Sequence, residues 1–218
     1  MKHNYLQLAF NHTWQDFVRL IPMVPHDEHI IIEAGTPFLK RYGIGVVSKM
    51  RRYWPGQIMA DLKVVDGAEQ EVRMAAAAET NLITALGSAG PESLQIFVDT
   101  CRRHNLSPVF DMLHVQKPMR KLWKARVLPD IVLLHLGRDE ENSHGKVIQY
   151  KEIAKIKGKW EVEVGVAGGI DAQGISSALF NGAEVVVVNA VKPSDPWRGL
   201  VIDQNFQQEL KKILSLLN

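Results

Sequence analysis

The sequence predicts a closed (β/α)8 barrel, a TIM barrel, that the whole chain of 218 residues (1–218) forms as one domain. Short apolar segments alternate with helical segments in eight units, as in parallel strands joined by right-handed crossovers. The expected strand ends fall near residues 11, 33, 61, 86, 111, 135, 167 and 189, a spacing that suits one strand and one helix per unit. Continuously apolar strands indicate burial on both faces, and a doubly wound sheet of eight strands would be unusually large for this length.

In the first half, strands are expected at 5–10, 29–33 and 81–86, with a further strand that begins at Gln57 and ends near Asp61. Helices are expected at 13–23, 38–50, 67–78 and 91–103, with Thr13 as an N-cap and Pro91 in a first helical turn. In the second half the pattern predicts strands at 109–113, 131–135, 162–166 and 184–188 and helices at 117–127, 146–157, 171–180 and 206–217.

The segment 61–66 carries three charges in the spacing Asp-x-Lys-x-x-Asp, directly after an apolar run. Strand alternation places Asp61 and Lys63 on one face and Leu62 on the other. Asp66 then stands before the helix expected at 67–78. One interpretation is a solvated strand-to-helix turn with Asp66 as the cap, and the other is a functional cluster.

Composition excludes several classes of function. Hydrophobic residues make up 46% and charged residues 23% of the chain, and the net charge is only +2. The densest basic stretch, 117–126, is interleaved with apolar residues, which predicts a solvated helix face rather than a nucleic-acid site. The single Cys101 excludes an internal disulfide and a Cys-based metal site. No stretch has signal-peptide character or approaches the ~20 apolar residues of a membrane span, so a cytoplasmic protein is expected.

Polar residues end the predicted strands, and the carboxyl ends of barrel strands are where reactive groups gather. These residues are Asn11, Glu33, Asp61, Lys63, Asp111 and His135. Like charges at such a mouth repel by up to ~4 kcal/mol per close pair at an effective dielectric near 20, so Lys63 and a divalent metal are expected to compensate. Carboxylates without thiols favour Mg²⁺.

Four segments resemble one enzyme family in order and spacing: Glu33-Ala34-Gly35-Thr36-Pro37, the run 60–66, His135-x-x-Arg138-Asp139 and Val166-Ala167-Gly168-Gly169. They are similar to the group of 3-hexulose-6-phosphate synthase and 3-keto-L-gulonate-6-phosphate decarboxylase, within the orotidine-5′-phosphate decarboxylase superfamily.

The resemblance implies a homodimeric barrel, with Mg²⁺ held by Glu33 and Asp61 and each active site completed by the partner's residue matching Asp66. Both family reactions pass through an enediolate of a pentulose 5-phosphate, whose charge Mg²⁺ and Lys63 would stabilise. His135 is placed to move a proton near neutral pH. Asp111 and Ala167 resemble the synthase branch, whereas Arg138 resembles the decarboxylase branch.

Two departures concern substrate binding. Asn11 stands where the family usually has Asp, and an amide cannot act as a base. The eighth strand ends at Asn189 without the Gly-Arg or Gly-Gly that contacts phosphate in the family. The following loop either brings Lys192 or Arg198 to an anion or is a solvated loop, and the sequence favours neither interpretation. Gly168 and Gly169 remain as a backbone anion site. A non-catalytic or regulatory barrel is the alternative that these departures motivate.

Overall fold

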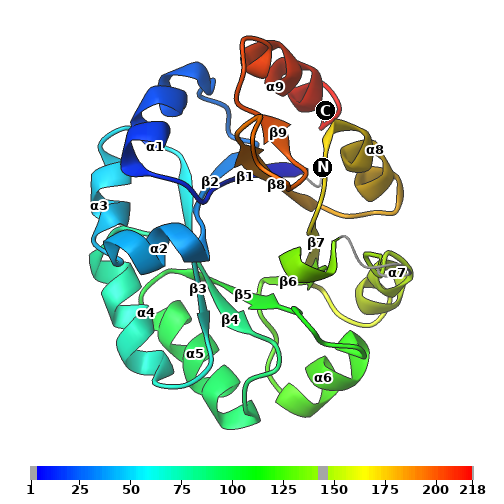
Figure 1. Ribbon diagram of the computed structural model, residues 1–218. Helices are drawn as coiled ribbons and strands as arrows, with labels where there is room; N and C mark the ends of the chain where they lie inside the picture. Colours follow the sequence, from blue (N-terminus) through cyan, green and yellow to red (C-terminus); the bar gives the residue numbers. More distant parts are fainter. Residues whose placement is uncertain (1–3, 142–146, 218) are drawn as a thin grey trace.

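The computed structural model describes residues 4–141 and 147–217. Their strands form a closed barrel, viewed along its axis in Figure 1. Each strand pairs in parallel with the next, and the pairing of the first strand with the eighth closes the barrel. The eight barrel strands are β1 (Tyr5–Phe10), β2 (Ile30–Ala34), β3 (Gln57–Val64), β4 (Leu82–Leu86), β5 (Ser107–Asp111), β6 (Ile131–His135), β7 (Glu163–Ala167) and β8 (Val185–Val191). The predicted (β/α)8 fold is therefore confirmed.

The α-helices surround the barrel (Figure 1). They are α1 (Trp14–Leu20), α2 (Thr36–Tyr42), α3 (Val46–Arg51), α4 (Ala68–Ala77), α5 (Pro91–Arg103), α6 (Pro118–Ala125), α7 (Lys151–Lys157), α8 (Ala172–Phe180) and α9 (Phe206–Leu214). Two short 3-10 turns, η1 (Ile21–Met23) and η2 (Arg138–Glu140), follow α1 and β6. Among the described residues, no helix is long and apolar enough to cross a membrane.

Two apolar cores follow from strand alternation. One face of each strand packs with the helices in the larger core, which includes Leu6, Ile32 and Val132. The opposite face fills the barrel with a second cluster, which includes Ile31, Met59 and Val109. On β2, β3 and β5, the residue two positions after the inner-cluster residue is a carboxylate: Glu33, Asp61 and Asp111. The barrel is thus packed with apolar side chains below and becomes polar only at the carboxyl ends of its strands.

Several predicted boundaries are wrong. The helix expected at 38–50 begins at Thr36 and is divided into α2 and α3, because Gly43 adopts φ 71° and ends α2. The helix expected at 13–23 continues beyond Leu20 only as a 3-10 turn that contains Pro22. The Thr13 prediction is confirmed, since its side chain accepts from the Asp16 backbone N–H in a capping box. Pro91 lies in the first turn of α5, as expected.

The second half also departs from the expected ranges. The strand predicted at 109–113 starts at Ser107 and admits Pro108 near its beginning. The helix predicted at 146–157 begins at Lys151, residue 146 being outside the described residues. The eighth strand passes through Asn189 to Val191, because its end pairs with the unpredicted two-residue strand β9 (Leu200–Val201). The last helix ends at Leu214 rather than 217.

The segment 61–66 is not a regular strand end. The β3–β4 register shifts between Ala60 and Val64, and Lys63 adopts φ 52°, a left-handed conformation that costs energy for a residue with a Cβ. The Lys63 backbone N–H turns to donate to Thr84 Oγ1 at 2.9 Å. Asp61 and Lys63 do share one side, as predicted, but a bulge rather than simple alternation brings them together.

Candidate active site

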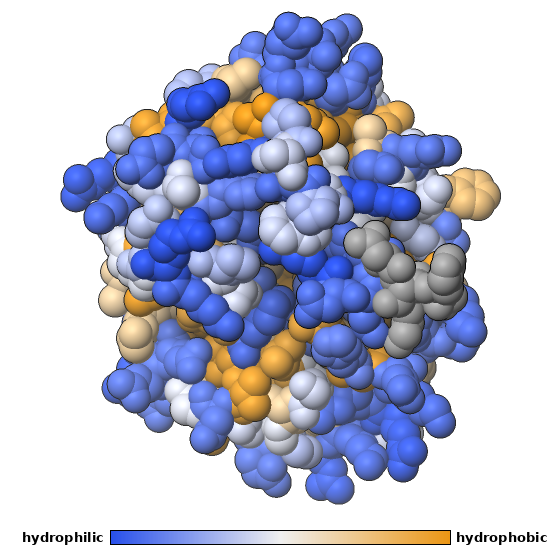
Figure 2. All heavy atoms as spheres, in the orientation of Figure 1, coloured by the Kyte–Doolittle hydropathy of each residue, from blue (hydrophilic) through white to orange (hydrophobic). Residues whose placement is uncertain are grey.

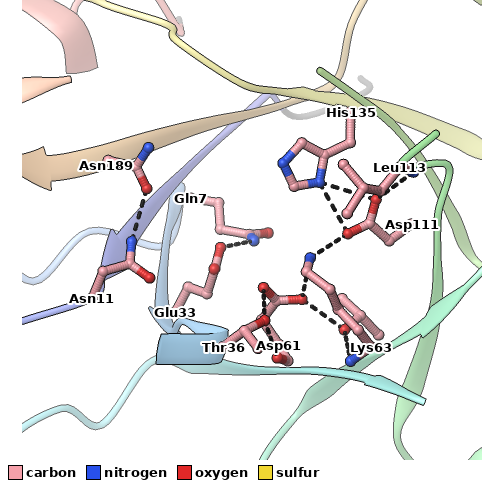
Figure 3. A network of polar contacts seen from close by, with 11 residues as sticks. Gln7, Asn11, Glu33, Thr36, Asp61, Lys63, Asp111, Leu113, His135 and Asn189 are labelled. Atoms are coloured by element: carbon pink, nitrogen blue, oxygen red, sulfur yellow. Dashed lines mark hydrogen bonds and ion pairs between the residues drawn. The ribbon is translucent and has the colours of Figure 1, made fainter. Parts of the chain in front are cut away.

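A cavity of about 290 Å³ opens at the carboxyl ends of the barrel strands. Hydrophilic residues dominate the middle of the face seen in Figure 2, and Figure 3 shows polar side chains from several strands that point toward one another. The side chains that line the cavity include Gln7, Asn11, Glu33, Thr36, Asp61, Lys63, Thr84, His135, Arg138, Glu141 and Asn189, together with Gly168. The predicted gathering of polar strand ends is thus present in one cavity.

The Lys63 ammonium lies between two carboxylates. Its Nζ is 3.0 Å from Asp61 Oδ1 and also donates a short hydrogen bond to Asp111 Oδ2 (Figure 3). Burial alone would lower the pKa of Lys63, but the two carboxylates outweigh it and raise the pKa above its ordinary value. Lys63 therefore remains a fixed cation at the wall of the cavity.

Asp111 links this cation to His135. Its carboxylate is fully buried, and both of its oxygens lie 3.0 Å from His135 Nδ1. Burial would raise the Asp111 pKa, but His135 and Lys63 hold it well below its usual range. For His135 burial acts to lower the pKa, and the Asp111 charge reverses this and raises it. Nδ1 faces Asp111, so the other ring nitrogen, Nε2, is the one available to a ligand.

Asp61 is fixed by two threonines that the sequence did not reveal as site residues. Thr36 Oγ1 donates to Asp61 Oδ2 at 2.7 Å, and Thr84 Oγ1 donates to Asp61 Oδ1 at 2.8 Å. Thr84 interrupts the apolar strand β4, a signal of an inward polar position, whereas the signal for Thr36, the first residue of α2, was its place in the segment 33–37. Both hydroxyls hold the carboxylate in one orientation beside Lys63.

Glu33 is a buried carboxylate whose closest polar partner is a neutral amide. The Gln7 side-chain amide donates to Glu33 Oε2, and Gln7 itself is a missed site residue, the polar exception in the inward face of β1. Burial and the nearby Asp61 charge raise the Glu33 pKa to about 7. Glu33 and Asp61 thus repel each other when both are ionised, and Glu33 keeps its proton until the pH approaches 7.

This pair of carboxylates fits magnesium. Mg²⁺ is commonly bound through one or two carboxylates, with water and substrate oxygens completing its shell. Among residues 4–141 and 147–217, no three His, Cys, Asp or Glu side chains are grouped as a metal site, and Glu33 and Asp61 both line the cavity. The oxygen donors and the repulsion between the two carboxylates favour a hard divalent cation over zinc.

The opposite side of the cavity is neutral. Asn11 Nδ2 donates to Asn189 Oδ1 at 2.9 Å, which joins the ends of β1 and β8 (Figure 3). Gly168 follows β7 with φ 107°, and a Cβ there would lie 2.1 Å from the Leu136 carbonyl oxygen, so only glycine fits. Amide groups form this wall at β1 and β8, and the glycine turn after β7 adds backbone that Glu141 contacts.

The two candidate cations of the loop after β8 differ in position. Lys192 Nζ pairs with Asp16 Oδ2 at 2.9 Å, outside the candidate cavity. Trp197 of the same loop stacks with Arg138, whose guanidinium carbon lies 4.3 Å from the ring centroid. Arg198 attracts Glu141, which lines the cavity. The structure therefore favours Arg198 over Lys192 as the loop cation near the site.

Asp66 does not join the cavity of its own chain. It is exposed and borders a separate shallow hollow beside Arg73 and Ile96. The interpretation that Asp66 caps the next helix is wrong, because the N-cap of α4 is Gly67 and no side chain caps it. Two other predicted site residues do not line the cavity but contact residues that do. Asp111 is buried behind Lys63 and His135, and Gly169 contacts Glu141. Asp66 is therefore the predicted site residue that lies apart from the cavity.

Comparison with known proteins agrees with this geometry. The profile of the Orotidine 5′-phosphate decarboxylase / HUMPS family matches residues 4–189. The bifunctional enzyme Fae/Hps of Methanothrix thermoacetophila is 35% identical over 211 residues, which are 95% of this chain and 53% of that enzyme. The chain thus spans about half the length of the curated relatives it matches.

Two solved structures show the same fold. The 3-hexulose-6-phosphate synthase of Salmonella typhimurium superposes with a TM-score of 0.81 at 24% identity, over 98% of this chain and all of that one. The 3-keto-L-gulonate-6-phosphate decarboxylase of Vibrio cholerae O1 biovar El Tor gives a TM-score of 0.74 at 19% identity, over 99% of both chains. The closed barrel agrees with the profile match and with the 35% identical relative. This chain belongs to the orotidine 5′-phosphate decarboxylase / HUMPS family.

Proposed function

We propose that this chain is a magnesium-dependent 3-hexulose-6-phosphate synthase, an aldehyde-lyase that joins formaldehyde to ribulose 5-phosphate. The observation that carries the proposal is the Lys63 ammonium, which two carboxylates fix at the cavity wall with His135 beside it. An enediolate forms when C1 of the sugar loses a proton, and a fixed cation stabilises the resulting charge more than it stabilises the neutral ketone.

The protein groups account for the proton and the bonds. His135 takes the C1 proton, C1 then bonds to the formaldehyde carbon as its C=O double bond opens, and the new alkoxide recovers a proton from His135. Asp111 orients the ring through Nδ1, which leaves Nε2 for this transfer. Lys63 stays protonated throughout because its pKa is raised.

Glu33 and Asp61 would hold the magnesium ion. When bound, the ion supplies positive charge to the oxygens of the enediolate, in addition to that of Lys63. The strongest support is the raised pKa of Glu33, because a divalent cation beside it would relieve the repulsion between the two carboxylates.

We propose that the neutral side of the cavity receives the sugar phosphate. Gly168 and Gly169 would offer backbone N–H groups, and the amides of Asn11 and Asn189 would add donors at the neighbouring strand ends. A homodimer would complete each site, with Asp66 of the partner subunit reaching the cavity. The exposed position of Asp66, away from its own cavity, supports this arrangement.

The runner-up function is that of 3-keto-L-gulonate-6-phosphate decarboxylase. Arg138 favours it, because this residue resembles the decarboxylase branch and lines the cavity. Asp111 and Ala167 resemble the synthase branch, and the curated relative that matches along 95% of the chain carries Hps in its name. These observations make the synthase the first candidate.

Purified protein incubated with formaldehyde, ribulose 5-phosphate and Mg²⁺ is expected to produce hexulose phosphate. Carbon dioxide release from 3-keto-L-gulonate 6-phosphate, without any synthase turnover, would transfer the assignment to the decarboxylase. Calorimetric titration with ribulose 5-phosphate and Mg²⁺ separates both from a non-catalytic barrel, which would bind without turning over.

A further inference from the structure

Glu141 occupies the end of the cavity where an anion is expected. It follows η2 and lines the cavity, and its carboxylate lies against Gly169. A Cβ added at Gly169 would lie 3.2 Å from the carboxylate carbon of Glu141. The chain therefore places one of its own carboxylates against the turn to which we assign the sugar phosphate.

The backbone under Glu141 has the form of an anion site. Gly168 and Gly169 both have positive φ, 107° and 58°, immediately after β7 and before α8. Consecutive backbone amides in such turns form concave sites that attract negatively charged oxygens. The side-chain carboxylate of Glu141 lies against this turn.

Cations surround the same carboxylate. Burial raises the pKa of Glu141, while the Gly169 N–H and the charges of Arg138, His135 and Arg198 act in the opposite direction. Arg138 and Arg198 come from two different loops, after β6 and β8, and Trp197 stacks on Arg138. Two loops therefore bring positive charge to a position that an internal anion already fills.

We propose that Glu141 is a resident competitor for the phosphate of the substrate, which binds only by displacing the Glu141 carboxylate from the Gly168–Gly169 turn. Arg138 and Arg198 then face the phosphate in place of Glu141. This inference rests on the proposed sugar-phosphate function and adds a residue that sets affinity at its phosphate end.

The competition explains how the site would select its ligand. A phosphate monoester carries nearly two negative charges near neutral pH and three acceptor oxygens, whereas Glu141 carries at most one charge and two oxygens. A phosphorylated sugar can therefore outcompete Glu141, while a ligand with a single carboxylate gains little over the group that it must replace. Glu141 thus acts as a threshold against weakly charged ligands.

The test is titration of inorganic phosphate into the full chain by calorimetry, for the wild type and for Glu141→Gln. Glu141→Gln keeps the size of the side chain but removes the competing charge, so phosphate should bind roughly tenfold more tightly. KM for ribulose 5-phosphate should fall in parallel, while kcat changes less than about twofold. Glu141→Ala serves as a second variant, because it removes the side chain that contacts Gly169.

Glu161→Gln is the matched control, since Glu161 is exposed and is not among the residues that line the candidate cavity. It should bind phosphate like the wild type. Unchanged or weaker phosphate binding in both Glu141 variants would overturn the inference and give Glu141 a supporting role in the glycine turn. Phosphate binding needs no turnover. Tighter phosphate binding by the Glu141 variants without synthase activity would therefore reject the proposed function and retain the competition. Synthase activity without tighter phosphate binding would reject the competition and retain the proposed function.

Discussion

The two sides of the cavity differ in what holds them. On the side of β2, β3, β5 and β6, buried charges hold one another: His135 contacts Asp111, Asp111 contacts Lys63, and Lys63 contacts Asp61. On the side of β8 and β1, the Asn11 and Asn189 amides meet through one neutral hydrogen bond. Removing a member of the charged side leaves a buried charge without its partner, whereas the neutral side can exchange its contacts with a ligand. We therefore expect chemistry on the charged side and binding on the neutral side.

The largest expected effect comes from Lys63→Ala. The variant should lose more than a hundredfold in kcat/KM, on the order of 3 kcal/mol in the transition state, because the enediolate loses its fixed cation. Asp61 and Asp111 also lose their shared partner, so thermal stability should fall, and activity is compared at a temperature at which circular dichroism shows the variant folded.

Lys124→Ala is the matched control, because Lys124 is exposed on α6 and is not among the residues that line the candidate cavity. It should leave kcat/KM unchanged. If Lys63→Ala kept wild-type turnover, the charged side would have only a structural role, and the division between chemistry and binding would fail.

A second experiment tests whether the charged side is complete within one chain. Lys63→Ala and Asp66→Ala homodimers should each be inactive, and mixing them in equal amounts with subunit exchange should restore about a quarter of the wild-type activity. Half of the dimers are then heterodimers, and each of these has one intact site.

Two results would contradict the shared site. An active Asp66→Ala homodimer would show that Asp66 has no part in the reaction, and an active monomer at nanomolar concentration would remove the need for a partner. Analytical ultracentrifugation at the assay concentration gives the oligomeric state in either case.

The sequence predicted the charged side better than the neutral side, and the reason is periodicity. Glu33, Asp61, Asp111 and His135 each end an apolar run, so the strand period and the barrel rule bring them to one mouth. The bulge at Lys63 was not predictable, because its positive φ accompanies a contact between strands, the hydrogen bond with Thr84, that has no local sequence pattern.

Contacts that join distant loops carry no local pattern. Glu141 reaches Gly169 across the space between the loops after β6 and β7, and no spacing rule relates the two positions. Strand β8 was predicted to end at Asn189, but it continues because a two-residue strand from a later loop pairs with it. Such features follow from tertiary packing and not from propensity.

A third and smaller effect concerns magnesium and pH. Without metal, the Glu33 pKa is about 7 in the folded chain against an ordinary value of 4.5. The folded state then holds a proton that the unfolded state has released, so the free energy of unfolding contributed by Glu33 is largest below pH 4.5 and falls as pH rises to about 7. Mg²⁺ binds the ionised form, so it should raise Tm more at pH 8 than at pH 5.5.

Differential scanning fluorimetry with EDTA or Mg²⁺ measures this shift. Glu33→Gln should remove the Mg²⁺-dependent rise in Tm and flatten the pH dependence in EDTA. Glu92→Gln, a change of the same kind on the exposed start of α5, should retain both. A full magnesium shift in Glu33→Gln would place the ion elsewhere.

The smallest expected effect lies on the neutral side, at the Asn11–Asn189 pair. A neutral hydrogen bond contributes about 1 kcal/mol, so Asn11→Ala and Asn189→Ala should each raise KM for the sugar phosphate by no more than about tenfold and leave kcat nearly unchanged. The double variant should lose less than the sum of the two, because either change alone already breaks the 2.9 Å contact. Strict additivity would mean that the two amides act separately on the ligand. A fall in kcat as large as that of Lys63→Ala would mean that the neutral side takes part in the chemistry. The two walls of the cavity would then no longer differ in the kinetic parameter, KM or kcat, that their variants change.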